Sequence, residues 1–291
     1  MNPITDIACV VINIVLIVVR LPVLLVLGII LSVQDALSLI PIVSHLIIIR
    51  SVRPLVCWLI LVSVGIVSPF SAKREDFRKL QVKRPDGKAR SCACTVSTFH
   101  GFIDVLVHAV ASKPDFFVFA ALDGTRIQSR TIIGAISVAL KAPIASSYDQ
   151  TSHIPENSVL FLSPSPTNGL GLLRMDTTAI SSALSGLPIQ ICALNYACVG
   201  RYYPHHLTES TFSHVMKLSL FNWYSSVGVS ILPEPLQFES VEDVPKLKTL
   251  MARLSAPAAV ETDIDPRMYL EFLAYWRETQ SRDYGVIKMR R

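Results

Sequence analysis

His100 and Asp104 are the two side chains of this 291-residue chain whose types and spacing best suit acid–base chemistry. Residues four apart lie on the same side of a helical turn, so the carboxylate can stand beside the imidazole. A carboxylate in that place fixes the imidazole tautomer and raises its basicity, which would let His100 take a proton from an alcohol. The spacing also fits an interpretation in which Asp104 only complements the N-terminus of a helix.

A segment rich in glycine and hydroxyl groups, Ser163–Gly171, is the second candidate for chemistry. It follows the apolar run Val159–Leu162, which we expect to be a buried strand. Two glycines and several hydroxyls would let a phosphate approach the backbone closely. Thr167, Asn168 and Gly169 are therefore candidate phosphate-binding residues, and a plain surface turn is the alternative.

Other nucleophiles and metal ligands are weaker candidates. Ser97 precedes His100 closely, but Ser-His-Asp chemistry would need a third group that the pattern does not place. Cys92 and Cys94 form a C-x-C with no partners at zinc spacing, so we expect buried free thiols and no metal. The remaining histidines of interest are expected to be structural or surface residues: His108, His205 and His206.

The first part of the chain has the composition of a membrane anchor. The whole sequence is 51% hydrophobic with a mean hydropathy of +0.47, and residues 7–70 are almost uncharged. This stretch is too long for a signal peptide, whose basic start it also lacks. We expect residues 1–70 to form a hairpin or two transmembrane helices, with Arg20 and Pro22 near a turn or a polar edge.

Basic residues follow the expected anchor closely. They favour anionic headgroups and a cytoplasmic position for residues 71–291. The cluster comprises Lys73, Arg74, Arg78, Lys79, Lys83, Arg84, Lys88 and Arg90.

Strands and helices alternate along residues 71–291, which we expect to form one domain. This alternation predicts an α/β fold with a mostly parallel sheet flanked by helices, preceded by N-terminal membrane-embedded helices. The expected strands are Lys79–Arg84, Ser91–Val96, Phe116–Ala121, Val159–Leu162, Pro188–Leu194 and Val227–Leu232. The expected helices are Gly101–Ala111, Ile127–Leu140, Asp176–Leu184, Ser240–Leu254 and Asp265–Thr279, with Ser240 as an N-cap.

The order of these pieces resembles the glycerolipid acyltransferase family, which includes the 1-acylglycerol-3-phosphate (lysophosphatidic acid) acyltransferases. In that family a strand leads into an N-H-x4-D motif, a later strand into an F-P-E-G-T-x-S-x-G loop, and a V-P-[VI]-x-P-[VI] strand follows. Here Ser91–Asp104, Val159–Leu173 and Gly186–Tyr196 come in that order. The resemblance covers roughly residues 71–256 and lies in arrangement more than in motif identity, so the chain resembles a divergent member.

The catalytic motif departs from the family pattern by one position. Three residues separate His100 from Asp104 where the family has four, so Phe99 aligns with the family histidine. A small backbone adjustment at Gly101 would restore the pair.

The phosphate-binding motif departs further. Pro164 and Ser165 stand where the family has glutamate and glycine. Asp123–Arg126 is similar to that motif but follows His100 too closely to be its counterpart. The family often has a phosphate-binding arginine in its middle motif, and Arg126 or Arg130 could take its place here.

The resemblance implies acyl transfer from acyl-CoA to a lysophospholipid hydroxyl, as in glycerolipid synthesis or remodelling. His100 would be the base and Asp104 would orient it, while Thr167, Asn168 and Gly169 would lie near the substrate phosphate. It implies no bound cofactor, with acyl-CoA as co-substrate, and partners that are membrane lipid and lysophospholipid rather than nucleic acid. The expected location is the endoplasmic reticulum or lipid droplet membrane, with the domain facing the cytosol.

Two alternatives stay open. A catalytically inactive protein of the same fold could act as a lipid-surface adaptor, as the altered motifs suggest. An unrelated membrane-anchored hydrolase is the other, although the sequence has no G-x-S-x-G elbow.

Overall fold

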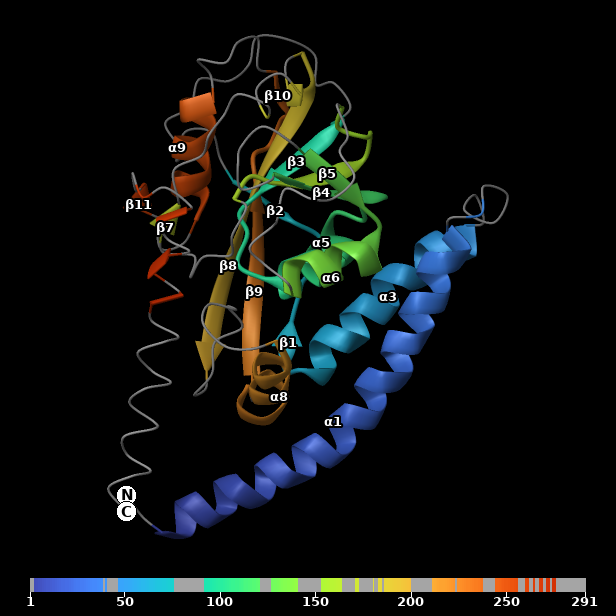
Figure 1. Cartoon of the computed structure of the whole chain (residues 1–291), viewed down its shortest axis with the longest axis vertical. Coiled ribbons are helices and arrows are strands. Elements are labelled where there is room, and N and C mark those ends of the chain that lie inside the picture. The colour runs from blue at the N-terminus through green and yellow to red at the C-terminus, as the bar shows by residue number, and fades with distance from the viewer. Residues whose placement is uncertain are drawn as a thin grey trace.

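The computed structural model describes residues 3–38, 40, 47–75, 92–120, 127–140, 153–163, 171–172, 180, 183–184, 186–199, 211–222, 224–237, 244–255, 260–261, 264, 267–268, 271–272 and 274–275. The helices (Figure 1) are α1 (Pro3–Ser38), α3 (Ile47–Ser63), α5 (Phe102–Ala111), α6 (Ile132–Leu140), α8 (Thr211–Phe221) and α9 (Val244–Leu254). The strands are β1 (Ile66–Val67), β2 (Lys73–Arg74), β3 (Cys94–Ser97), β4 (Phe116–Ala120), β5 (Ile127–Arg130), β6 (Ser158–Phe161), β7 (Gly171–Leu172), β8 (Pro188–Val199), β9 (Tyr224–Ile231), β10 (Leu236–Gln237) and β11 (Val260–Glu261).

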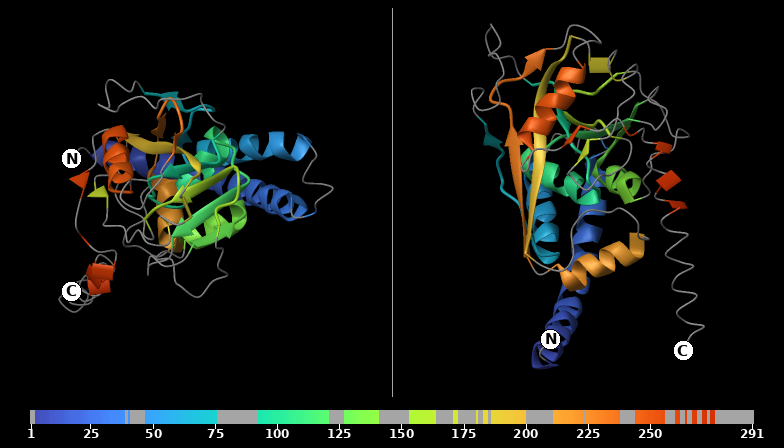
Figure 2. Two further views of the ribbon diagram at one scale, coloured as in Figure 1. Left: turned by 90° about the horizontal axis from the view of Figure 1, so that it is seen from above. Right: turned by 90° about the vertical axis from the view of Figure 1, so that its left-hand side faces the viewer.

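The main sheet is mixed but mostly parallel, with the strand order β1-β9-β8-β3-β6-β4-β5. Strand β3 pairs in parallel with β6 and β8, and β4 pairs in parallel with β6. Strands β9 and β5 run antiparallel to β8 and β4. The long β8–β9 pair (Figure 2) continues past the point where β8 leaves β3, at the pairing of Cys192 with Ser97. Side chains on this overhang therefore border the loop that follows β3.

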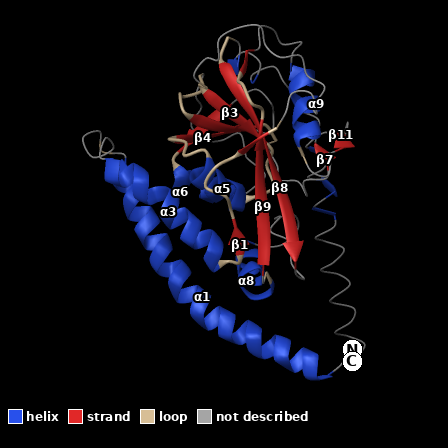
Figure 3. Cartoon of the chain, turned by 180° about the vertical axis from the view of Figure 1, so that it is seen from behind, coloured by secondary structure: helices blue, strands red, loops and turns tan. Residues whose placement is uncertain are grey.

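Helices cover both faces of this sheet (Figure 3) and bury two apolar cores. Side chains alternate along each strand, so Phe117 and Phe119 of β4 face one core while Val118 and Ala120 face the other. Helices α3, α5 and α6 pack on the first face and α9 on the second. The predicted α/β class with a mostly parallel sheet flanked by helices is confirmed.

Helix α5 lies deepest, because every residue from Phe102 to Val110 is buried. A helix that is apolar all round must be covered on all sides. The sheet covers one side of α5, where His108 meets Ser97 of β3 and Phe161 of β6, and α3 and α6 cover others. The N-terminus of α5, which carries Asp104, is thus enclosed within the domain.

Helix α1 runs unbroken through Pro22, so of the two predicted placements of Arg20 and Pro22 the turn is wrong, and the polar edge is the one that remains. Arg20 instead packs against the domain, where its Nη1 donates to the carbonyl oxygens of Ser219 (2.8 Å) and Asn222 (3.0 Å). These carbonyls end α8, where the helix dipole is negative and a cation is favoured. The charge that interrupts the apolar sequence is satisfied by a helix end, which removes the need for a turn.

Asp35 binds the N-terminus of a helix, whereas Arg20 binds the C-terminus of one, and the two lie at opposite ends of the contact between α1 and the domain. Its Oδ2 accepts hydrogen bonds from Thr131 Oγ1 (2.7 Å) and from the Ile133 backbone N–H (3.2 Å) at the N-terminus of α6. A carboxylate there satisfies donors that the first helical turn leaves unpaired. Arg20 and Asp35 therefore dock α1 lengthwise onto the domain.

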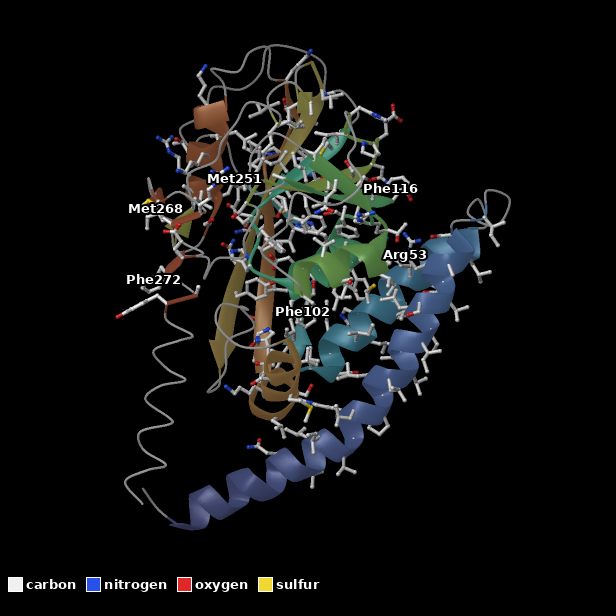
Figure 4. The ribbon with its side chains drawn as sticks, viewed as in Figure 1. Arg53, Phe102, Phe116, Met251, Met268 and Phe272 are labelled. Carbon is white, nitrogen blue, oxygen red and sulfur yellow. The ribbon has the colours of Figure 1, made fainter. Side chains whose placement is uncertain are left out.

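The opposite face of α1 is apolar and exposed, with its side chains pointing away from the domain (Figure 4). Within the described ranges, one helix is long and apolar enough to cross a membrane, Val15–Ser38, with a mean hydropathy of 2.8 and 11% of its window buried. Its length and composition fit a membrane span or a signal sequence. The exposed residues include Val15, Val18, Val19, Leu21, Val23, Leu25, Val26, Ile29, Ile30, Val33 and Leu37.

Helix α3, by contrast, packs one face into the interior, while Leu55, Leu59 and Val62 on its other side are exposed. Its Cys57 and Leu61 are fully buried in the core around α5, and β1 joins the main sheet beside β9. The predicted division between residues 1–70 and 71–291 stays a prediction, but α3 and β1 show that residues before position 71 help build the domain core.

Most predicted elements that lie in described residues are confirmed, although several bounds differ. The prediction of one helix over Ile127–Leu140 is wrong in its first part, because residues 127–130 form β5 and pair with β4. Their apolar-polar sequence suits an edge strand, and the helix begins only after Thr131, which bonds Asp35. Helix α8 was not predicted.

Some predictions fall on residues outside the described ranges. These are the strand Lys79–Arg84 and the N-cap Ser240, together with most of the helices Asp176–Leu184 and Asp265–Thr279.

Replacing Asp35 by alanine should lower the free energy of unfolding by about 1–2 kcal/mol, because the donors of Thr131 and Ile133 lose their acceptor. Asp35→Asn should cost less, since an amide oxygen can still accept. Thermal unfolding in detergent measures both, with Val33→Ala on the exposed face as the control. Equal unfolding temperatures for wild type and Asp35→Ala would contradict this docking role.

Candidate active site

The candidate site lies at the carboxyl end of β3, where Thr98–Gly101 link the strand to α5. In parallel sheets the carboxyl ends of the strands form the usual ligand-binding edge. The Thr98 hydroxyl accepts the backbone N–H of Leu194 (3.4 Å), which ties this link to β8. Strand β6 pairs in register with β3, Phe161 opposite Ser97, so the segment that begins at Ser163 leaves the sheet at the same edge.

His100 and Asp104 meet as their spacing predicts. The His100 Nδ1 lies 3.3 Å from the Asp104 Oδ2. Between them Gly101 has φ 157° and ψ −168°, a region that residues with a Cβ seldom enter. Because Nδ1 faces the carboxylate, Nε2 is the ring nitrogen directed away from Asp104.

Asp104 also caps the helix, so the contact with His100 and the cap of the helix N-terminus occur together. Its Oδ2 accepts the backbone N–H of His100 and that of Gly101 (3.4 Å), and its Oδ1 accepts the hydroxyl of Tyr196. The carboxylate is fully buried. Burial alone would raise the pKa of Asp104, but the charge of His100 and hydrogen bonds from His100 and Tyr196 outweigh it and lower that pKa. Asp104 is therefore held as a carboxylate.

Phe99, the residue aligned with the family histidine, points into the core. Its ring centroid lies 5.1 Å from that of Phe161 and 5.7 Å from that of Phe119, and the side chain is 1% exposed. The imidazole at position 100 is thus the one that reaches the carboxylate.

Ser97 is paired with a different histidine. Its Oγ lies 2.7 Å from Nε2 of His108, whose Nδ1 lies 3.2 Å from Ser112 Oγ. Neither Ser97 nor His108 has any exposed surface, so this pair has no contact with solvent. Burial lowers the pKa of His108 to about 4, which keeps its ring neutral. We assign Ser97 and His108 a structural role.

Several sequence candidates cannot be placed. Thr167, Asn168 and Gly169 lie outside the described residues, as do Arg126, His205 and His206. Among described residues no group of three or more histidine, cysteine or acidic side chains could hold a metal ion. Cys94 is a buried free thiol, as predicted, whereas Cys92 is free but exposed, because it lies before β3 begins; the prediction that its thiol is buried is wrong.

Tyr196 is the site residue that sequence reasoning missed. It lies on the β8 overhang, on the same face as Cys192 and Leu194. Its ring meets that of His100 edge-on, with centroids 5.6 Å apart and an angle of 79°. The period-two alternation of Pro188–Leu194, continued by two residues, would have placed it on this face.

No family model, curated protein or solved structure matches this chain. The resemblance to glycerolipid acyltransferases therefore stays a prediction from the sequence.

The neutral, buried His108 predicts a pH dependence of stability. Its folded pKa of about 4 lies below the unfolded value of about 6.5, so the unfolded chain binds more protons between these values. Stability should fall as pH drops from about 6.5 to about 4, by up to roughly 3 kcal/mol from this group.

Denaturant titrations across that range measure the effect. His108→Gln should be less stable at neutral pH and should lose this part of the slope, whereas His153→Gln at an exposed position should keep it. An unchanged slope in His108→Gln would contradict the assignment.

Proposed function

We propose that this protein transfers an acyl chain from acyl-CoA to the hydroxyl of a lysophospholipid, resembling a lysophosphatidic acid, at a membrane surface. The observation that carries the proposal is the 3.3 Å approach of His100 Nδ1 to Asp104 Oδ2 at the carboxyl edge of the sheet. The same edge is where the glycine- and hydroxyl-rich segment departs after Ser163. The sequence resemblance supplies the reaction class.

The proposed reaction is a direct transfer. Nε2 of His100 takes the proton of the lysolipid hydroxyl as its oxygen attacks the thioester carbonyl carbon. The C–S bond then breaks, the ester forms, and the imidazolium returns its proton to the departing CoA thiolate. The Asp104 carboxylate balances the positive charge on the ring during the step. No covalent enzyme intermediate is needed, and Thr167, Asn168 and Gly169 are proposed to lie near the substrate phosphate.

A lipid surface is the proposed partner of the exposed face of α1. Contiguous apolar surface of this extent marks an interaction site, and an apolar helix face suits a bilayer. Arg20 and Asp35 hold the domain along about 22 Å of the helix, at 1.5 Å per residue. A spanning orientation would draw the polar ends of α6 and α8 into a hydrocarbon layer about 30 Å thick. We therefore propose that α1 lies along the membrane plane.

The basic residues that follow the anchor in the sequence support a cytosolic position for the domain. The endoplasmic reticulum or lipid droplet membrane remains the proposed location.

A catalytically inactive lipid-surface adaptor is the second candidate, favoured by burial. The His100 side chain is 3% exposed and Asp104 is not exposed at all. The Asp104 oxygens already accept donors from the loop and from Tyr196, as a purely structural cap would.

An acyl-transfer assay separates the two candidates. The full chain, purified in detergent, would receive labelled oleoyl-CoA and a panel of lysolipids. His100→Gln and Asp104→Asn should each lower turnover by about 10²–10⁴-fold, because the base or its orienting charge is lost. His153→Gln at an exposed position should leave turnover unchanged. A folded wild-type protein that transfers to no acceptor would contradict the enzyme and favour the adaptor.

Membrane association should depend on the exposed face of α1. Val26→Glu combined with Ile30→Glu should weaken binding about tenfold or more, since both apolar contacts with lipid are replaced by charges. Flotation with phosphatidylcholine–phosphatidylserine vesicles measures the bound fraction. Phe116→Glu, an exposed position on β4, is the control and should float like wild type. Normal flotation of the double variant would contradict the proposed lipid contact.

A further inference from the structure

Tyr196 brings the sheet into the candidate site from a distant part of the chain. It lies on β8, four residues beyond Cys192, the last β8 residue that pairs with β3. Opposite it, β9 supplies Val227 as its antiparallel partner. The phenol is thus fixed by a paired strand rather than by a loop, and rigid elements position polar groups more accurately.

The two oxygens of Asp104 are divided between two sources. Oδ2 faces the residues that precede it, His100 and Gly101. Oδ1 accepts the Tyr196 hydroxyl, which lies 92 positions away in sequence. A carboxylate that is held at both oxygens cannot rotate about its terminal torsion without breaking one set of contacts.

The Tyr196 hydroxyl also favours the charged form of Asp104. A buried carboxyl tends to become neutral, and donors to its oxygens oppose that tendency. Hydrogen bonding from Tyr196 is one of the interactions that lower the pKa of Asp104, after the charge and hydrogen bonding of His100. The ring of Tyr196 meanwhile rests edge-on against the imidazole and limits its tilt.

We propose that Tyr196 is a positioning residue, which holds the Asp104 carboxylate and the His100 ring aligned so that His100 is presented as the base. This inference rests on the proposed acyl transfer and assigns to that site a third residue, on β8, that acts through Asp104 rather than on substrate.

Tyr196→Phe tests the inference because it removes the hydroxyl and keeps the ring. The carboxylate charge is then less dispersed, so it should stabilise the imidazolium more strongly. The His100 titration, followed by NMR of ¹⁵N-histidine-labelled protein in detergent, should shift upward by about half a pH unit or more. Turnover should fall about tenfold with little change in KM for either substrate, and the acid limb of the pH–rate profile should move to higher pH.

Two comparisons separate positioning from a general structural role. Tyr224→Phe, at a half-exposed tyrosine on β9, should change neither the His100 titration nor turnover. In an Asp104→Asn background, Tyr196→Phe should add no further shift, because its effect passes through the carboxylate.

The outcomes for Tyr196 and for the reaction are distinguishable. An unshifted His100 titration in folded Tyr196→Phe overturns the inference, whatever the activity. If the His100 titration shifts in Tyr196→Phe but the wild-type protein transfers no acyl chain, the coupling of Tyr196 to His100 is supported and the proposed reaction is overturned.

Discussion

A buried carboxylate must find its donors within the protein, and that requirement at Asp104 organises the centre of this molecule. Asp104 is fully buried, so water cannot satisfy it. Its donors are the backbone that leads into α5 and the hydroxyl of Tyr196 on β8, and the His100 ring lies 3.3 Å away as its charge partner. Satisfying one group therefore fixes the entry of the deepest helix, the orientation of an imidazole and the approach of a sheet strand. A change in any of these partners reaches the other two through the same two oxygens.

The same constraint explains how the apolar helix α1, with Arg20 and Asp35 in its sequence, packs without a turn. Arg20 and Asp35 would be costly in lipid or in an apolar core. Each instead meets a helix end of opposite partial charge, the carbonyls that end α8 and the donors that begin α6. The two charges thus select which face of α1 contacts the domain. The opposite apolar face is left exposed, and the adjacent helix α3 is drawn into the core.

Local patterns in the sequence predicted the α/β class, most strands, α5 and the meeting of His100 with Asp104, because these depend on periodicity and short spacing. What they could not supply were contacts between distant segments. Tyr196 reaches Asp104 only through the pairing of β8 with β3, and Arg20 reaches α8 only through tertiary packing. The helical spacing over 127–140 predicts a helix from Ile127, but residues 127–130 form β5 because they pair with β4. For Thr167, Asn168 and Gly169 the prediction is untested, since they lie outside the described residues.

The His100–Asp104 spacing is one residue shorter than in the acyltransferase motif, but this difference does not keep the two side chains apart. Positions 99 and 100 point to different sides of the link, so Phe99 fills the aromatic core while His100 turns to Asp104. Four residues along an early helical turn return to the same side, so the shorter spacing still closes the pair. What separates an enzyme from an inert scaffold is then the reach of Nε2, because a base must come within hydrogen-bonding distance of the hydroxyl it deprotonates. Tyr196 and Asp104 can orient and polarise the imidazole, but the protein cover over a side chain that is 3% exposed must open for acyl transfer to proceed.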